Sequence, residues 1–125
     1  MTSTNKFILV AEDDVFYGDI FKTKLTKEGY DVEVATNGEE ALKIARGRKP
    51  DLMLCDLIMP IKDGFETVKE MKADSKLKSV KILVLSNLGQ EADIERAKKL
   101  GADEYFVKSD LSIQQMIEKV RKYVA

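Results

Sequence analysis

Five short runs of mostly apolar residues recur along the chain, and each is followed by a longer stretch of mixed polarity. Runs this short, bounded by charged residues or turn formers, are typical of strands. Continuous apolar runs indicate strands buried on both faces, whereas the second run, DVEVA, alternates. The expected strands are Lys6–Ala11, Asp31–Ala35, Leu52–Cys55, Lys81–Leu85 and Glu104–Val107.

Apolar residues in the intervening stretches recur near helical spacing, which predicts amphipathic helices that bury one face. The first such helix is expected over Val15–Glu28. Three later helices open with an N-cap residue followed three positions on by Glu or Gln, and glycines follow two of the helices. The capping pairs are Asn37 with Glu40, Asp63 with Glu66 and Ser112 with Gln115, and the glycines are Gly29 and Gly101.

The order strand then helix is therefore repeated five times. Alternation with short connections predicts an α/β fold of three layers, in which helices cover both faces of a parallel five-stranded sheet. Such crossovers are right-handed almost without exception. No linker, low-complexity segment or internal repeat interrupts the pattern, so residues 1–125 are expected to form a single domain.

Composition excludes several classes of function. The 125 residues include 21 Lys and Arg against 22 Asp and Glu, which gives a net charge of −1 and no general attraction to nucleic acid or an anionic membrane. The absence of histidine removes histidine-based catalysis and the commonest metal ligand. A single cysteine, Cys55, allows neither an internal disulfide nor a zinc cluster.

No apolar segment approaches the roughly 20 residues that cross a bilayer. Residues 1–11 also lack the apolar core of a signal peptide. A cytoplasmic protein is therefore the expectation.

The most informative stretch is Asp51–Gly64, in which an apolar run ends abruptly at Asp56. In a parallel sheet the carboxyl ends of all strands lie along one edge, and ligands bind there in open α/β sheets. The other strands should bring further polar residues to that edge. These residues are Glu12, Asp13 and Asp14 after the first strand, Ser86 after the fourth and Lys108 after the fifth.

Clustered carboxylates repel one another unless a cation neutralises them. Oxygen ligands without histidine or cysteine suit a hard ion, Mg²⁺, for which Mn²⁺ can substitute. A hydroxyl and an ammonium beside that ion would complete a site for phosphate oxygens. The set therefore favours phosphoryl transfer to a carboxylate, with Asp56 as the nucleophile.

The sequence resembles a response-regulator receiver domain of two-component regulatory systems. The resemblance covers about Lys6–Val124 and rests on four segments in the right order and spacing: ILVAEDD, DLMLCDLIMPIKDGFE, ILVLS and GADEYFVKS. It implies a flavodoxin-like (βα)5 sandwich with strand order 2-1-3-4-5 and a single receiver domain.

The resemblance also implies roles for the acidic residues. Asp56 matches the phosphorylated aspartate. Glu12 and Asp13 match the acidic pair that holds the metal with Asp56, and Ile58 matches the residue that adds a backbone carbonyl. The alternative pair, Asp13 with Asp14, fits the spacing to the end of the first helix less well.

Three further roles follow from the resemblance. Ser86 matches the switch hydroxyl, Lys108 the lysine that pairs with the phosphoryl group, and Tyr105 the aromatic residue that turns inward on activation. Ser109 replaces the usual proline after the lysine, and a trans peptide bond is expected there because a cis bond without proline costs roughly 2.5–4 kcal/mol.

A receiver of this kind takes its phosphoryl group from a phosphohistidine on a histidine kinase or a histidine phosphotransfer domain. It then presents the face formed by the fourth helix, fifth strand and fifth helix to an output protein or domain, as a monomer or a phosphorylation-dependent dimer. Neither nucleic acid nor membrane is an expected direct partner. The protein would be no enzyme in the ordinary sense, since it catalyses only its own phosphorylation and dephosphorylation.

Two rival functions stay open at this point. One is a receiver-like protein-interaction module that works without phosphorylation, which Ser109 and Asn87 leave possible. The other is a hydrolase with an aspartyl nucleophile, but such enzymes usually carry a second acid where this chain has Ile58.

Overall fold

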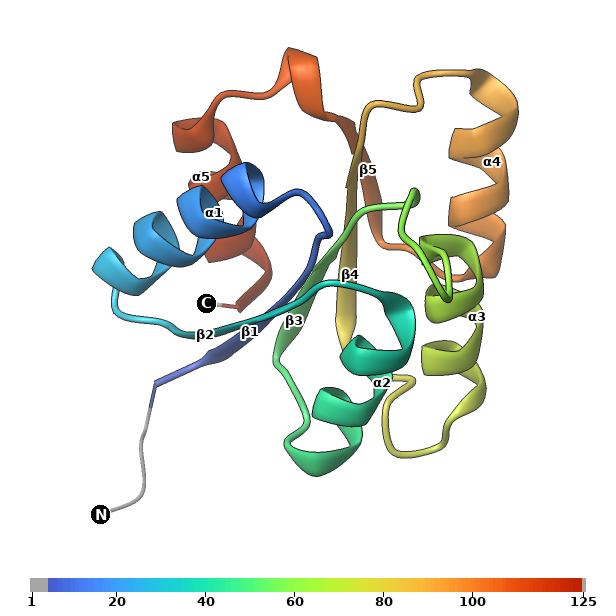
Figure 1. The fold of residues 1–125 in the computed structure, drawn as a ribbon, viewed down its shortest axis with the longest axis horizontal. Coiled ribbons are helices and arrows are strands. Elements are labelled where there is room, and N and C mark those ends of the chain that lie inside the picture. The colour runs from blue at the N-terminus through green and yellow to red at the C-terminus, as the bar shows by residue number, and fades with distance from the viewer. Residues whose placement is uncertain (1–4, 125) are drawn as a thin grey trace.

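The computed structural model describes residues 5–124. Its five strands form one parallel sheet in the order β2-β1-β3-β4-β5, and helices alternate with the strands along the chain (Figure 1). The expected fold class and strand order are confirmed. The elements are β1 (Phe7–Ala11), α1 (Val15–Lys27), β2 (Asp31–Ala35), α2 (Gly38–Gly47), β3 (Leu52–Cys55), α3 (Gly64–Ala73), β4 (Lys81–Ser86), α4 (Glu91–Leu100), β5 (Glu104–Val107), the 3-10 turn η1 (Lys108–Asp110) and α5 (Ile113–Val124).

The helix starts follow the capping residues of the sequence. Asn37 accepts a hydrogen bond from the backbone N–H of Glu40 at 2.9 Å, and Asp63 caps α3 in the same way. Ser112 and Gln115 form the full reciprocal pair, with distances of 3.1 and 2.9 Å. These bonds satisfy N–H groups that a helix start leaves without a partner, so they fix where each helix begins.

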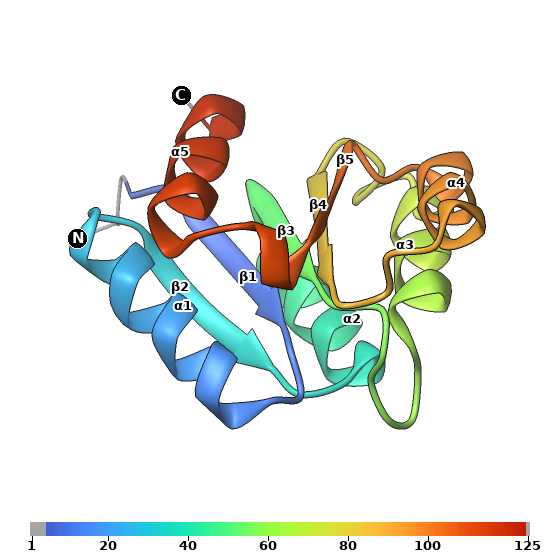
Figure 2. The ribbon, with the colours of Figure 1, turned by 90° about the horizontal axis from the view of Figure 1, so that it is seen from above.

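Helices cover both faces of the sheet and create two separate hydrophobic cores. Helices α1 and α5 lie on one face, and α2, α3 and α4 lie on the other (Figure 2). Along β1, Phe7, Leu9 and Ala11 enter the core under α2–α4, whereas Ile8 and Val10 enter the core under α1 and α5. A central strand with apolar neighbours on both faces explains the unbroken apolar run in the sequence.

Because all neighbouring strands pair in parallel, their carboxyl ends lie along one edge of the sheet. Backbone pairing continues just past two of the strands and holds the acids there. The N–H of Glu12 donates to the carbonyl of Ala35 at 2.8 Å, and the N–H of Asp56 donates to that of Ala11 at 2.9 Å. Glu12 and Asp56 therefore sit on a rigid backbone.

Among residues 5–124, no helix combines the length and apolar character needed to cross a membrane.

Candidate functional site

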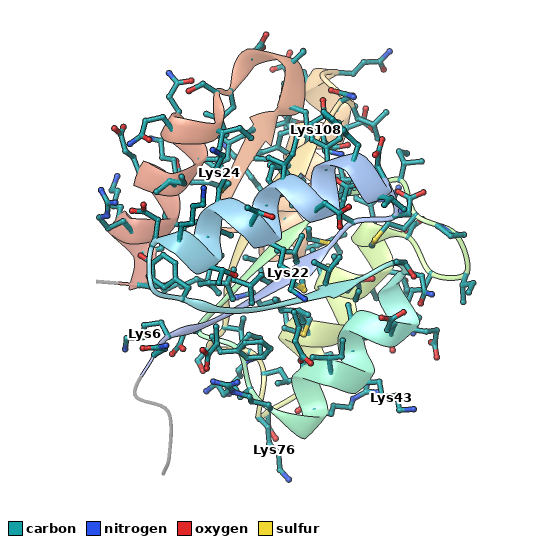
Figure 3. The ribbon with its side chains drawn as sticks, turned by 60° about the vertical axis from the view of Figure 1, so that its left-hand side comes forward. Lys6, Lys22, Lys24, Lys43, Lys76 and Lys108 are labelled. Atoms are coloured by element: carbon teal, nitrogen blue, oxygen red, sulfur yellow. The ribbon has the colours of Figure 1, made fainter. Side chains whose placement is uncertain are left out.

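Lys108 joins two acidic residues at the carboxyl edge of the sheet. Its ammonium Nζ lies 3.0 Å from Asp56 Oδ2 and also pairs with Glu12 Oε1. All three side chains are buried, which is rare for charged groups unless they are paired. Figure 3 labels Lys108 beside the first turns of α1, and the other lysines labelled there are exposed. The predicted convergence of strands β1, β3 and β5 on one point is thus found.

Burial and nearby charges shift the pKa values of Glu12 and Lys108. Burial raises the pKa of Glu12, the hydrogen bond from Lys108 opposes that rise, and the nearby charge of Asp56 adds to it. Burial alone lowers the pKa of Lys108, but its hydrogen bonds to Glu12 and Asp56 and the charges of both acids outweigh burial and raise it. Lys108 therefore stays a cation at neutral pH.

Glu12, Asp13 and Asp56 offer carboxylate oxygens that lie within 4.8 Å of one another. Asp13 is exposed, so the group opens to solvent on one side. An all-oxygen donor set of this size fits a hard divalent cation such as Mg²⁺. Asp14 is engaged elsewhere, because its carboxylate accepts a hydrogen bond from the N–H of Phe16 at 2.9 Å and caps α1.

Ile58 lies in the loop that follows Asp56. Its backbone N–H donates to Asp56 Oδ1 at 3.3 Å, and the residue is 59% exposed. The backbone of Ile58 is therefore close to the acidic group, while its side chain faces solvent. That its carbonyl binds a metal stays a prediction.

Ser86 and Tyr105 both form hydrogen bonds with the backbone of Leu88. Ser86 is fully buried at the end of β4, and its Oγ accepts from the N–H of Leu88 at 3.3 Å. The half-buried Tyr105 hydroxyl donates to the carbonyl of the same Leu88. Burial, with the negative charge of Asp93, raises the pKa of Tyr105, so the hydroxyl keeps its proton. Both side chains thus hold the start of the β4–α4 loop.

The peptide bond between Lys108 and Ser109 is trans, as expected, since none of the described peptide bonds is cis. Lys108 opens the 3-10 turn η1, and Ser109 is exposed.

Two features between β3 and the first turn of α3 are not predicted by the sequence patterns. Gly64 packs so tightly that a Cβ there would lie 2.1 Å from the carbonyl oxygen of Asp56. Ile61 has a φ of 69°, a left-handed conformation that costs a non-glycine residue roughly 1–2 kcal/mol, and it is 80% exposed. The Asp63-Gly64 pair is the one local signal in this segment, and it indicates a helix start.

Comparisons with known proteins agree with this geometry. A family model of the response regulator receiver domain matches residues 8–121. The polar-differentiation response regulator DivK of Brucella anthropi is 29% identical over 119 residues, which cover 95% of this chain and 96% of DivK. A probable transcriptional regulator, ycf27 of Porphyra purpurea, is 39% identical over 108 residues, 86% of this chain and 43% of that protein. The chain thus spans less than half the length of ycf27.

Solved structures show the same fold. Chemotaxis protein CheY4 of Vibrio cholerae superimposes with a TM-score of 0.89 at 27% identity, covering 96% of this chain and 99% of CheY4. The Mn²⁺-bound form of response regulator Rcp1 gives a TM-score of 0.80 at 25% identity, covering 94% of this chain and 90% of Rcp1.

Proposed function

Because this chain belongs to the response regulator receiver domains of two-component systems, we propose that it is a phosphoacceptor whose Asp56 takes a phosphoryl group from a phosphohistidine. The observation that carries the proposal is the buried contact of Lys108 with both Asp56 and Glu12 at the carboxyl edge of the sheet. A paired cation at a reactive carboxylate suits phosphoryl transfer, in which charge on the moving group must be neutralised.

The chemical step uses Asp56 as the nucleophile. A carboxylate oxygen forms a bond to phosphorus while the bond from phosphorus to the donor imidazole nitrogen breaks. The imidazole leaves with that electron pair, and the product on this chain is an aspartyl phosphate. Lys108, which now donates to Asp56 Oδ2, would move its hydrogen bond to a phosphoryl oxygen.

Receiver domains bind a divalent metal, and we propose Mg²⁺ here, held by Glu12, Asp13, Asp56 and the Ile58 carbonyl. Bound there, the ion would offset negative charge on the phosphoryl group. Support comes from the three clustered carboxylates and from Rcp1, a similar protein solved with Mn²⁺. Glu12 already shares Lys108 with Asp56, so Asp13 is the acid freest to contact an ion directly.

Ser86 and Tyr105 are proposed to carry the signal away from Asp56. The buried Ser86 hydroxyl would turn from the N–H of Leu88 toward the phosphoryl group. That movement would change the loop whose Leu88 carbonyl holds the Tyr105 hydroxyl, and Tyr105 would turn inward. The free energy must come from contacts that differ between the two states. The responding face would be α4, β5 and α5.

Response regulators work with histidine kinases and output domains. We propose that the donor, a histidine kinase or a histidine phosphotransfer domain, docks over the exposed apolar side chains around the carboxyl edge. These are Val15, Phe16, Ile58 and Ile61. A cytoplasmic location, the absence of direct nucleic-acid binding, and a monomer or phosphorylation-dependent dimer stay predictions, as does a single domain over residues 1–125.

Incubation with acetyl phosphate and Mg²⁺, followed by intact-mass spectrometry, tests the proposed function. We expect one added phosphoryl group on the wild type. Asp56→Asn keeps the size of the side chain but removes the nucleophile, and excess EDTA removes the ion, so neither sample should gain mass. An unmodified wild type that also fails to bind Mg²⁺ would favour the rival module that signals without phosphorylation.

The aspartyl phosphate is expected to decay slowly. Ile58 and Leu88 occupy the positions two residues after Asp56 and Ser86, and neither apolar side chain can orient an attacking water. The loss of the added mass after removal of acetyl phosphate measures the lifetime. A lifetime of only seconds would contradict this expectation, and Ile58→Asn should shorten the lifetime by supplying a polar side chain.

A further inference from the structure

The ring of Tyr17 lies against the ammonium of Lys108. The Nζ atom is 4.4 Å from the ring centroid, well inside the range in which a cation is attracted to an aromatic face. Tyr17 comes from the first turn of α1 and Lys108 directly follows β5, so the contact joins two parts of the chain that are far apart in sequence. Lys108 thus has Glu12 and Asp56 as charged partners and Tyr17 as an aromatic one.

The Tyr17 ring is itself held in place. Its neighbour Phe16 meets it edge to face at 5.7 Å between centroids, and Phe21, one helical turn further on, lies at 5.8 Å. Asp14 fixes the start of the helix by accepting from the N–H of Phe16. The half-buried Tyr17 ring thus packs against Phe16 and Phe21 beside the Lys108 ammonium.

The contact with Tyr17 restricts Lys108, whose side chain is long and flexible. The turn that follows it, η1, continues with the exposed residues Ser109 and Asp110, which provide no packing around the ammonium. Hydrogen bonds to Asp56 and Glu12 must rearrange when a phosphoryl group arrives. Attraction to a ring face depends weakly on direction across that face, so the contact with Tyr17 can persist while the hydrogen bonds change.

We propose that Tyr17 is a positioning residue for phosphoryl transfer, whose ring face keeps the Lys108 ammonium beside Asp56 before and after the reaction. The inference rests on the proposed phosphoacceptor function, because it assigns Tyr17 a part in that reaction. The ring face acts, and the hydroxyl is not needed.

Three variants test the proposal: Tyr17→Leu removes the ring, Tyr17→Phe retains it, and Tyr30→Leu serves as the matched control. Tyr30 is also half-buried and packs against the same core under α1 and α5. The phosphorylation rate with acetyl phosphate and Mg²⁺ should fall about threefold to tenfold in Tyr17→Leu, the range expected for loss of one cation–π contact. Tyr17→Phe and Tyr30→Leu should match the wild type.

A second measurement does not depend on phosphorylation. Protons on the Lys108 side chain near the ring face should resonate upfield in NMR spectra of the metal-free protein. The shift should persist in Tyr17→Phe and disappear in Tyr17→Leu, and circular dichroism would verify that each variant is folded.

The outcomes separate this inference from the proposed function. A wild type that neither takes up a phosphoryl group nor binds Mg²⁺ overturns the proposed function. Unchanged Lys108 shifts in Tyr17→Leu overturn the contact on which the inference depends. Equal phosphorylation rates in Tyr17→Leu and the wild type overturn the positioning role. A Tyr17→Phe variant as slow as Tyr17→Leu overturns it too, because the hydroxyl would then matter.

Discussion

Lys108→Met should destabilise the metal-free protein by about 2–3 kcal/mol, because removing one partner of a buried ion pair leaves the other charge without compensation. This loss of stability is smaller than that expected for a deeply buried ion pair, because the acidic group opens to solvent at Asp13. Urea denaturation in EDTA measures the difference. Phosphoryl uptake from acetyl phosphate should fall sharply in the same variant.

The same substitution should make stability depend more strongly on Mg²⁺. Without Lys108, three carboxylates share the group with no ammonium between them, so a divalent cation should bind more tightly and restore more of the lost stability. Lys22→Met removes one positive charge from an exposed position on α1 and is the control for net charge. Weaker Mg²⁺ stabilisation in Lys108→Met than in Lys22→Met would contradict the proposed metal site.

Gly64→Ala is the second substitution with a large expected effect. The new Cβ would lie 2.1 Å from the carbonyl oxygen of Asp56 and 2.6 Å from the Cα of Leu57, and backbone atoms cannot turn aside as a side chain can. The loop would have to shift and move the Asp56 carboxylate with it. We expect a loss of about 2–4 kcal/mol in stability. Phosphoryl uptake should slow by about a hundredfold, as misplacement by an ångström can do.

Gly47→Ala provides the matched control for that substitution. Gly47 ends α2, and a Cβ there would meet no atom within 4 Å. Its stability should stay equal or rise by up to about 1 kcal/mol, because alanine is the better helix former. If Gly64→Ala were phosphorylated at the wild-type rate, the loop would tolerate movement and its close packing would have no part in placing Asp56.

The sequence predicts the elements of this fold closely, because each signal is local. The strand over Leu52–Cys55 and the helix start at Ser112 depend on neighbouring residues and are found as expected. The strand order came only from the resemblance, since alternation of strands and helices is compatible with several orders. Convergence of Asp56 and Lys108 on one edge followed from the parallel sheet itself.

The interior of the site was harder to predict, because its contacts join residues far apart in the chain. Tyr17 lies in the helix expected over Val15–Glu28, and nothing local in the sequence indicates that Lys108 lies over its ring. The shared attachment of Ser86 and Tyr105 to Leu88 depends on the path of a loop. The left-handed conformation of Ile61 contradicts the preference of a β-branched residue, so sequence patterns point away from it.

The two cores on opposite faces of the sheet affect how the sequence can change in evolution. Among the described residues, no side chain belongs to both cores, so a change of volume under α2–α4 calls for compensation only on that face. Paired substitutions among descendants should therefore fall within one layer and rarely across the sheet. One layer can therefore diverge while the opposite layer, and the edge that both layers share, stay as they are.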